Sequence, residues 1–143
     1  MIQRKQSIWL FLAAMLNGAL FIFPVFRYQP AMKFEPVLEF ARSYLPLFIV
    51  AAVITLLPLI TIFLFGNRKR QKGMTLLNIL LNLGFMALAL MRVSQVKQTN
   101  GADTAIIYDI GMLLPVAAIV FLFMAWRGIR HDEKLIKSLD RLR

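Results

Sequence analysis

Hydrophobic residues are gathered into four long segments that are separated by short polar stretches. The segments cover residues 7–26, 44–66, 74–91 and 105–126, and each is 18 to 23 residues long. A helix of that length crosses a hydrocarbon core of roughly 30 Å, and these segments lack the polar stripe of a surface helix in a soluble domain. The pattern predicts an all-α membrane protein, in which one domain over residues 1–143 forms an antiparallel bundle of four transmembrane helices.

The polar breaks between the segments support this division. A cluster of Arg and Lys at residues 68–72 follows the second segment, and Asn100 and Gly101 form a typical turn dipeptide. The second half of the first break, residues 36–43, is predicted to form a short interfacial helix. Aromatic residues that favour the membrane interface lie near the segment ends: Trp9, Tyr28, Tyr44, Tyr108 and Trp126.

The composition limits the chemistry that the chain can perform. Apolar residues make up 59% of it and the mean hydropathy is +0.69, which is more than a soluble domain usually carries. There is no cysteine and only one histidine, which excludes disulfides, cysteine-ligated zinc, iron–sulfur clusters, thiol nucleophiles and multi-histidine metal sites. No pair of catalytic side chains is expected at one membrane depth. We therefore expect no enzyme activity and no cofactor.

The net charge of +10 has two possible meanings, nucleic-acid binding or membrane orientation. Twelve of the 17 Lys and Arg lie in the N-terminus, in the break at residues 68–72 and in the tail after residue 126, and the other five lie in the two remaining breaks. Because Lys and Arg accumulate in cytoplasmic segments, this distribution predicts that both termini are cytoplasmic. We therefore expect no nucleic-acid partner.

The tail at residues 127–143 is expected to leave the fourth span as an amphipathic cytoplasmic helix. Its apolar side consists of Leu135, Ile136, Leu139 and Leu142, and its basic side of Arg130, Lys134, Lys137 and Arg141. In one interpretation the helix lies on the inner leaflet, with the basic residues toward anionic headgroups. In the other it docks into a groove of a protein partner.

Three consecutive residues in the tail, His131, Asp132 and Glu133, suggest a metal or acid–base cluster at first sight. Adjacent residues of a helix do not face one another, and nothing else in the tail supplies a ligand. We expect no metal site there.

Three amides lie inside the apolar segments. Asn78 and Asn82 are four residues apart and share one helix face, and Asn17 is expected at a similar depth in the first helix. They are interpreted as interhelical hydrogen-bonding groups, with a permeation or ligand site as the alternative. Gly84 would permit close backbone approach beside them, and Pro58 is expected to bend the second helix.

Asp109 is the one formal charge inside the four segments. It is expected about one turn inside the fourth helix on the outer side, and Arg92 ends the third helix at a similar depth. An unpaired intramembrane carboxylate is costly, so the sequence predicts a structural ion pair between Arg92 and Asp109. The alternative is a free Asp109 that binds a cation or a proton.

Three parts of the chain, residues 1–14, 65–71 and 132–143, together with the four-span layout, resemble an uncharacterised family of small four-helix membrane proteins of Bacteroidota. The resemblance covers most of the chain. It implies a bacterial inner-membrane protein, and it implies no particular activity, substrate or cofactor.

The function expected from these features is that of a non-enzymatic accessory or scaffold subunit of a larger inner-membrane assembly. Its partners would be lipids of the anionic inner leaflet and a larger membrane protein, with no small-molecule substrate. A small oligomeric transporter or channel is the alternative. Such a protein would need a continuous polar path, and little but apolar residues lies between the three amides and Asp109.

Overall fold

The computed structural model describes residues 3–30, 35–101 and 104–140. Within them the chain is mostly helical, with four α-helices and a small sheet. The helices are α1 (Gln3–Gly18), α2 (Leu45–Phe63), α3 (Arg68–Asn100) and α4 (Ile110–Asp140). Short 3₁₀ turns, η1 (Ala19–Phe21) and η2 (Ala41–Ser43), follow α1 and precede α2.

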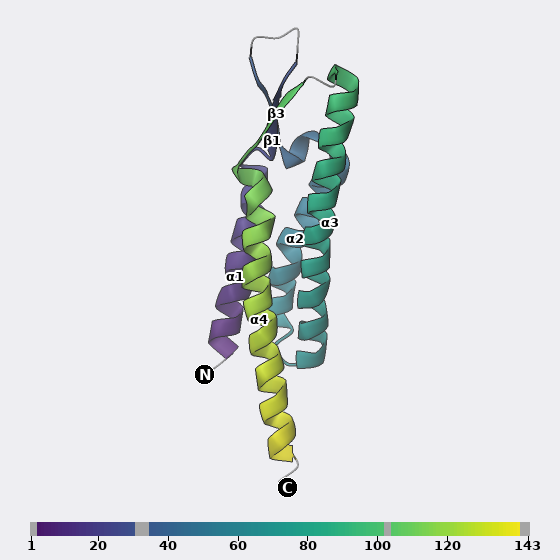
Figure 1. Cartoon of the computed structure of the whole chain (residues 1–143). Helices are drawn as coiled ribbons and strands as arrows, with labels where there is room; N and C mark the ends of the chain where they lie inside the picture. Colours follow the sequence, from purple (N-terminus) through teal and green to yellow (C-terminus); the bar gives the residue numbers. More distant parts are fainter. Residues whose placement is uncertain (1–2, 31–34, 102–103, 141–143) are drawn as a thin grey trace.

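The four helices lie side by side in an elongated molecule (Figure 1). Both α1 and α3 pack against α2 and α4, so each helix has two helical neighbours. The sheet lies at one end, here called the sheet end. The beginning of α1 and the end of α4 lie at the opposite end, here called the terminal end.

Two clusters of buried apolar side chains fill the interior. The cluster nearer the sheet end brings Val25 and Phe26 together with residues of α2 and α3, among them Leu47 and Phe85. The second cluster joins α1 to α4 and is rich in alanine: Leu10, Ala13, Ala118, Leu122 and Ala125. Small side chains at these positions allow the two helices to approach closely.

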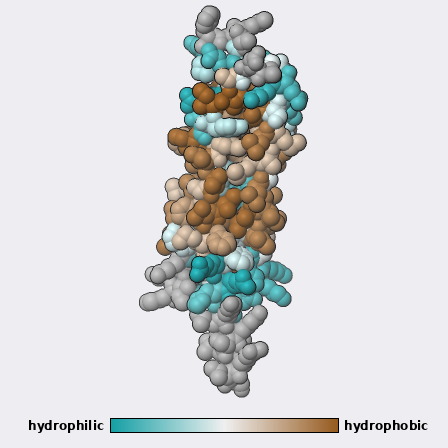
Figure 2. All heavy atoms as spheres, in the orientation of Figure 1, coloured by the Kyte–Doolittle hydropathy of each residue, from teal (hydrophilic) through white to brown (hydrophobic). Residues whose placement is uncertain are grey.

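The outside of the helices is apolar along the middle of the molecule and polar at both ends (Figure 2). Among the described residues, α2, α3 and the Ile110–Glu133 part of α4 are long and apolar enough to cross a membrane. The apolar part of the first helix, Gln6–Phe21, is shorter. Many large apolar side chains are exposed on these helices, which suits contact with lipid and not with water. The structure is thus consistent with a membrane protein.

The small sheet departs from the predicted all-α class. Strands β1 (Phe26–Gln29), β2 (Val37–Glu39) and β3 (Ala105–Tyr108) form an antiparallel sheet in the order β2-β1-β3. Residues 36–43 therefore form a strand and a 3₁₀ turn, and the predicted interfacial helix there is wrong. The first four residues of the last apolar segment are also strand, because Ile106, Ile107 and Tyr108 suit a pleated surface and hydropathy alone does not distinguish strand from helix.

Candidate functional site

The three buried amides converge on one backbone carbonyl of α2. Asn17 on α1 and Asn78 on α3 both donate a side-chain hydrogen bond to the oxygen of Ile54, at 3.0 and 3.3 Å. Asn82 donates to the backbone and side-chain oxygens of Asn78, at 2.9 and 2.7 Å. All three amide side chains are fully buried. The structure thus brings the predicted group together, and it connects three helices through a single acceptor.

The acceptor is available because of a proline. In an α-helix the oxygen of residue 54 would accept a hydrogen bond from the N–H of residue 58, and Pro58 has no N–H. A carbonyl left unpaired in an apolar interior costs free energy comparable to a lost hydrogen bond. The amides of Asn17 and Asn78 supply the missing donors from the two neighbouring helices, so α1, α2 and α3 are aligned at this level.

Two amide oxygens of this group, the Oδ1 atoms of Asn17 and Asn82, are buried without a hydrogen-bond partner in the described part of the chain. The Nδ2 atom of each amide already donates within the chain, Asn17 to Ile54 and Asn82 to Asn78, while its Oδ1 atom accepts nothing from the described residues. A small donor such as a water molecule would satisfy them, since buried waters typically bond to otherwise unpaired polar groups. The amides therefore form a structural junction with spare accepting capacity.

We expect that replacing Asn17 with alanine lowers the unfolding free energy by about 1 kcal/mol. The loss should be smaller in a Pro58→Ala background, because the N–H restored at position 58 can bond to the oxygen of Ile54. Unfolding of the four proteins of this double-mutant cycle in one detergent measures the coupling. A cycle of Asn17→Ala with Pro115→Ala in α4 serves as the control. If Asn17→Ala lowers the unfolding free energy equally with and without Pro58, Pro58 is not the reason that the Ile54 carbonyl is available.

At the sheet end, Asp109 binds an arginine that the sequence analysis did not consider. Arg27 on β1 approaches the Oδ2 atom of Asp109 with Nε at 2.7 Å and with a terminal nitrogen at 2.6 Å. Asp109 follows β3 and immediately precedes α4, and its backbone N–H bonds to the oxygen of Val25 at 3.1 Å. The carboxylate therefore stands at the junction of strand and helix, and not one turn inside the helix as predicted.

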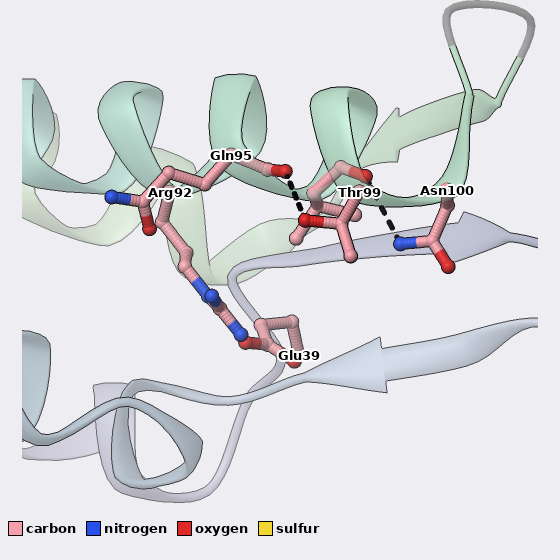
Figure 3. A network of polar contacts seen from close by, with 6 residues as sticks. Glu39, Arg92, Gln95, Thr99 and Asn100 are labelled. Atoms are coloured by element: carbon pink, nitrogen blue, oxygen red, sulfur yellow. Dashed lines mark hydrogen bonds and ion pairs between the residues drawn. The ribbon is translucent and has the colours of Figure 1, made fainter.

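Arg92 has a different partner, Glu39 at the end of β2. Its Nε lies 3.0 Å from Oε1 of Glu39, and its guanidinium lies 4.7 Å from the centre of the Tyr44 ring. Figure 3 shows Arg92 pointing from α3 toward Glu39, while Thr99 and Asn100 bond back to the same helix. The predicted Arg92–Asp109 pair is wrong. The prediction compared depths along straight helices and did not include the sheet. The strands of the sheet supply a nearer partner to both Arg92 and Asp109.

A second group of charges lies at the terminal end. Asp132 of α4 is buried and accepts a hydrogen bond from Gln6 of α1, and Arg68 of α3 lies 3.5 Å from it. Glu133 forms an ion pair with Lys72 at 2.6 Å. These contacts connect α4 to α1 and α3. Asp132 and Glu133 thus face basic and amide groups of neighbouring helices, while His131 is exposed. Within the described ranges, no group of three or more His, Cys, Asp or Glu could hold a metal ion.

The predicted tail is only partly described. Helix α4 runs on without interruption to Asp140, so positions 134–140 are helical as expected. Arg130 stacks over the Trp126 ring at 5.2 Å. The described part of the structure excludes residues Arg141 and Leu142 and the side chains of Lys134, Leu135, Ile136, Lys137 and Leu139.

Four of the residues that organise these polar groups had no signal in the sequence analysis: Gln6, Arg27, Glu39 and Arg68. Each lies outside or at the edge of an apolar segment, where a charged or amide side chain is ordinary.

These features define a class of protein: a mostly helical chain with several apolar helices of membrane-spanning length. Polar contacts join its elements at both ends. The chain belongs to the family described as a domain of unknown function (DUF4293), which matches residues 2–142. Neither the curated proteins nor the solved structures contain a match to this chain.

Proposed function

We propose that this protein is a non-enzymatic accessory or scaffold subunit of a larger assembly in a bacterial inner membrane. In this proposal α1 together with η1 forms a fourth span beside α2, α3 and α4, and both termini are cytoplasmic. The excess of Lys and Arg at the terminal end supports that orientation. The fully buried cluster between α1 and α4 supports a place for α1 among the spanning helices.

The observation that carries the proposal is the length of α4. This helix has 31 residues and extends past the other helices at the terminal end (Figure 1). It continues in the direction of the molecule's long axis, and does not turn aside as a helix lying on a membrane surface would. Asp132 and Glu133 hold this helix against α1 and α3. The part beyond them, residues 134–140, is here called the arm.

The arm's sequence suits a docking role. Leu135, Ile136 and Leu139 lie on one side of a helix and lysines on the others. A helix that projects into water with an apolar stripe leaves that stripe without cover, and insertion into a groove of a partner buries it. Of the two roles open to the tail, its direction favours docking to a protein over lying on the inner leaflet.

The intramembrane polar groups support a structural role over transport. Asn17, Asn78 and Asn82 donate to acceptors within the chain and draw three helices together. Two ion pairs lie at the sheet end, Arg27 with Asp109 and Arg92 with Glu39. Groups that line a permeation path must instead offer free donors or acceptors along its length.

A small oligomeric transporter remains the second candidate, on one specific observation. The free Oδ1 atoms of Asn17 and Asn82 are buried acceptors at the level of the amide junction. In an oligomer these oxygen atoms would be able to bind a transported cation or a row of water molecules. This function requires further polar groups contributed by neighbouring copies.

The decisive experiment is purification of the full chain from its native membrane in mild detergent, with identification and quantification of the co-purifying chains. We expect a stoichiometric membrane-protein partner for the wild type, and its loss in the Leu135→Ser/Leu139→Ser variant. The matched control is Lys134→Ser/Lys137→Ser, which alters the other side of the arm and should retain the partner. A homogeneous homo-oligomer without a second chain would contradict the accessory role and favour the transporter.

A further inference from the structure

A groove of about 890 Å³ lies at the terminal end on the outside of α1 and α4. One part of its wall is aromatic and consists of Trp9, Phe123 and Trp126. The other part consists of Arg127, Arg130 and His131. Apart from Trp9 of α1, these residues lie on adjacent turns of α4, so the groove changes from apolar to basic along that helix.

The aromatic wall is held by ring contacts. Trp9 stacks on Phe121 with 5.6 Å between ring centres, and Phe123 stacks on Trp126 at 5.8 Å. Arg130 lies over the Trp126 ring, which restricts its guanidinium to the edge of the groove. The surface is therefore organised before any ligand binds, which lowers the entropic cost of binding.

The charge of the groove is of one sign. None of the described residues that line it is acidic. The two acids that follow His131 are turned toward α3 and α1, where Asp132 meets Gln6 and Arg68 and Glu133 meets Lys72. These acids are engaged elsewhere, and among the described residues no ion pair joins a carboxylate to Arg127 or Arg130.

The position of the groove suits an amphiphile. It lies where the apolar middle of the molecule meets the polar terminal end, the level at which tryptophan and headgroups are found in membrane proteins. An acyl chain fits the aromatic part. Guanidinium groups bind phosphate with charge-assisted hydrogen bonds, and basic pockets between helices at this level suit anionic lipid headgroups.

We propose that this groove is a binding site for one anionic phospholipid, with the phosphate on Arg127 and Arg130 and an acyl chain along Trp9 and Phe123. The site lies on the membrane-facing surface of α1 and α4 and does not involve the arm. It is therefore independent of the proposed protein partner and goes beyond the proposed function. It makes this end of the molecule selective for lipid charge.

The chain offers a direct probe of this site, because its two tryptophans, Trp9 and Trp126, both line the groove. The full chain is reconstituted in phosphatidylcholine vesicles that contain a minor, equal fraction of brominated phosphatidylglycerol or of brominated phosphatidylcholine. Bromine quenches tryptophan on contact. We expect the anionic lipid to quench more strongly, with an enrichment at the groove on the order of tenfold.

The variant Arg127→Gln/Arg130→Gln should abolish this excess quenching. Lys69→Gln/Arg70→Gln is the matched control, since it removes the same charge from exposed residues at the same end that do not line the groove, and the excess should persist. Each variant is normalised to its own quenching by brominated phosphatidylcholine.

Three outcomes would overturn the proposal. Equal quenching by both brominated lipids would show no selectivity, and an equal loss in the control variant would show general surface attraction in place of a site. Absence of quenching by brominated phosphatidylcholine as well would contradict membrane insertion itself. A missing protein partner would leave all of these measurements unchanged, so the two proposals fail separately.

Discussion

The Gly111→Ala variant is expected to lose about 3 kcal/mol or more of unfolding free energy, the largest effect of an alanine at any glycine of this chain. Gly111 lies in the first turn of α4 and donates its N–H to the oxygen of Pro24 at 3.0 Å. A Cβ there would lie 2.4 Å from that oxygen, 2.8 Å from the Pro24 carbonyl carbon and 2.9 Å from Cα of Val25. All three are backbone atoms, so no side chain can rotate away and the segment before β1 must move.

The matched control is Gly84→Ala in the middle of α3. A Cβ at Gly84 would meet nothing within 4 Å, so the expected close approach of backbones at this glycine is wrong. Alanine is the better helix former, and this variant should be neutral or more stable by about 0.5–1 kcal/mol. Thermal or denaturant unfolding of both variants in one detergent measures the difference. Similar stabilities of the two variants would contradict the close approach at Gly111.

The helices were largely predictable, because a long apolar segment can be recognised in the sequence without knowing which other segments pack against it. The apolar segments at 44–66 and 74–91 fall on α2 and within α3, and α3 ends at Asn100, next to the expected turn at Gly101. Gly101 has a φ of 102°, which side-chain-bearing residues rarely adopt. The shared face of Asn78 and Asn82 followed from helix periodicity alone.

The sheet and the ion pairs were not predictable in the same way, because they depend on partners far apart in the chain. Arg27 and Asp109 are 82 residues apart, and Arg92 and Glu39 are 53 apart. Counting depth along straight helices placed Arg92 and Asp109 at one level. It could not show that β1 and β2 insert two further charged residues at that level. The role of Ile54 was hidden for a related reason, since a freed carbonyl carries no side-chain signature and only Pro58 marks its position.

The Arg92→Leu variant is expected to lower the unfolding free energy by about 3 kcal/mol, because it leaves a buried carboxylate without its counter-ion. The side chain of Glu39 is only 8% exposed, and Arg92 is its ion-pair partner. The substitution also removes the contact of the Arg92 guanidinium with the Tyr44 ring. Arg42→Leu is the control, since Arg42 is exposed and stacks on Phe40. The unfolding free energy of the Arg42→Leu variant should fall by about 1 kcal/mol or less.

A double-mutant cycle distinguishes the observed partner of Arg92 from the predicted one. Glu39→Leu combined with Arg92→Leu removes both charges, and the double variant should be less destabilised than the sum of the two single losses. Arg92→Leu combined with Asp109→Leu involves two residues with different partners, so their losses should add to within about 0.5 kcal/mol. Asp109 should instead couple to Arg27, whose nitrogens lie 2.6 and 2.7 Å from its carboxylate. Coupling between Arg92 and Asp109, with additive losses for Arg92 and Glu39, would mean that α3 is attached to the start of α4 and not to the end of β2.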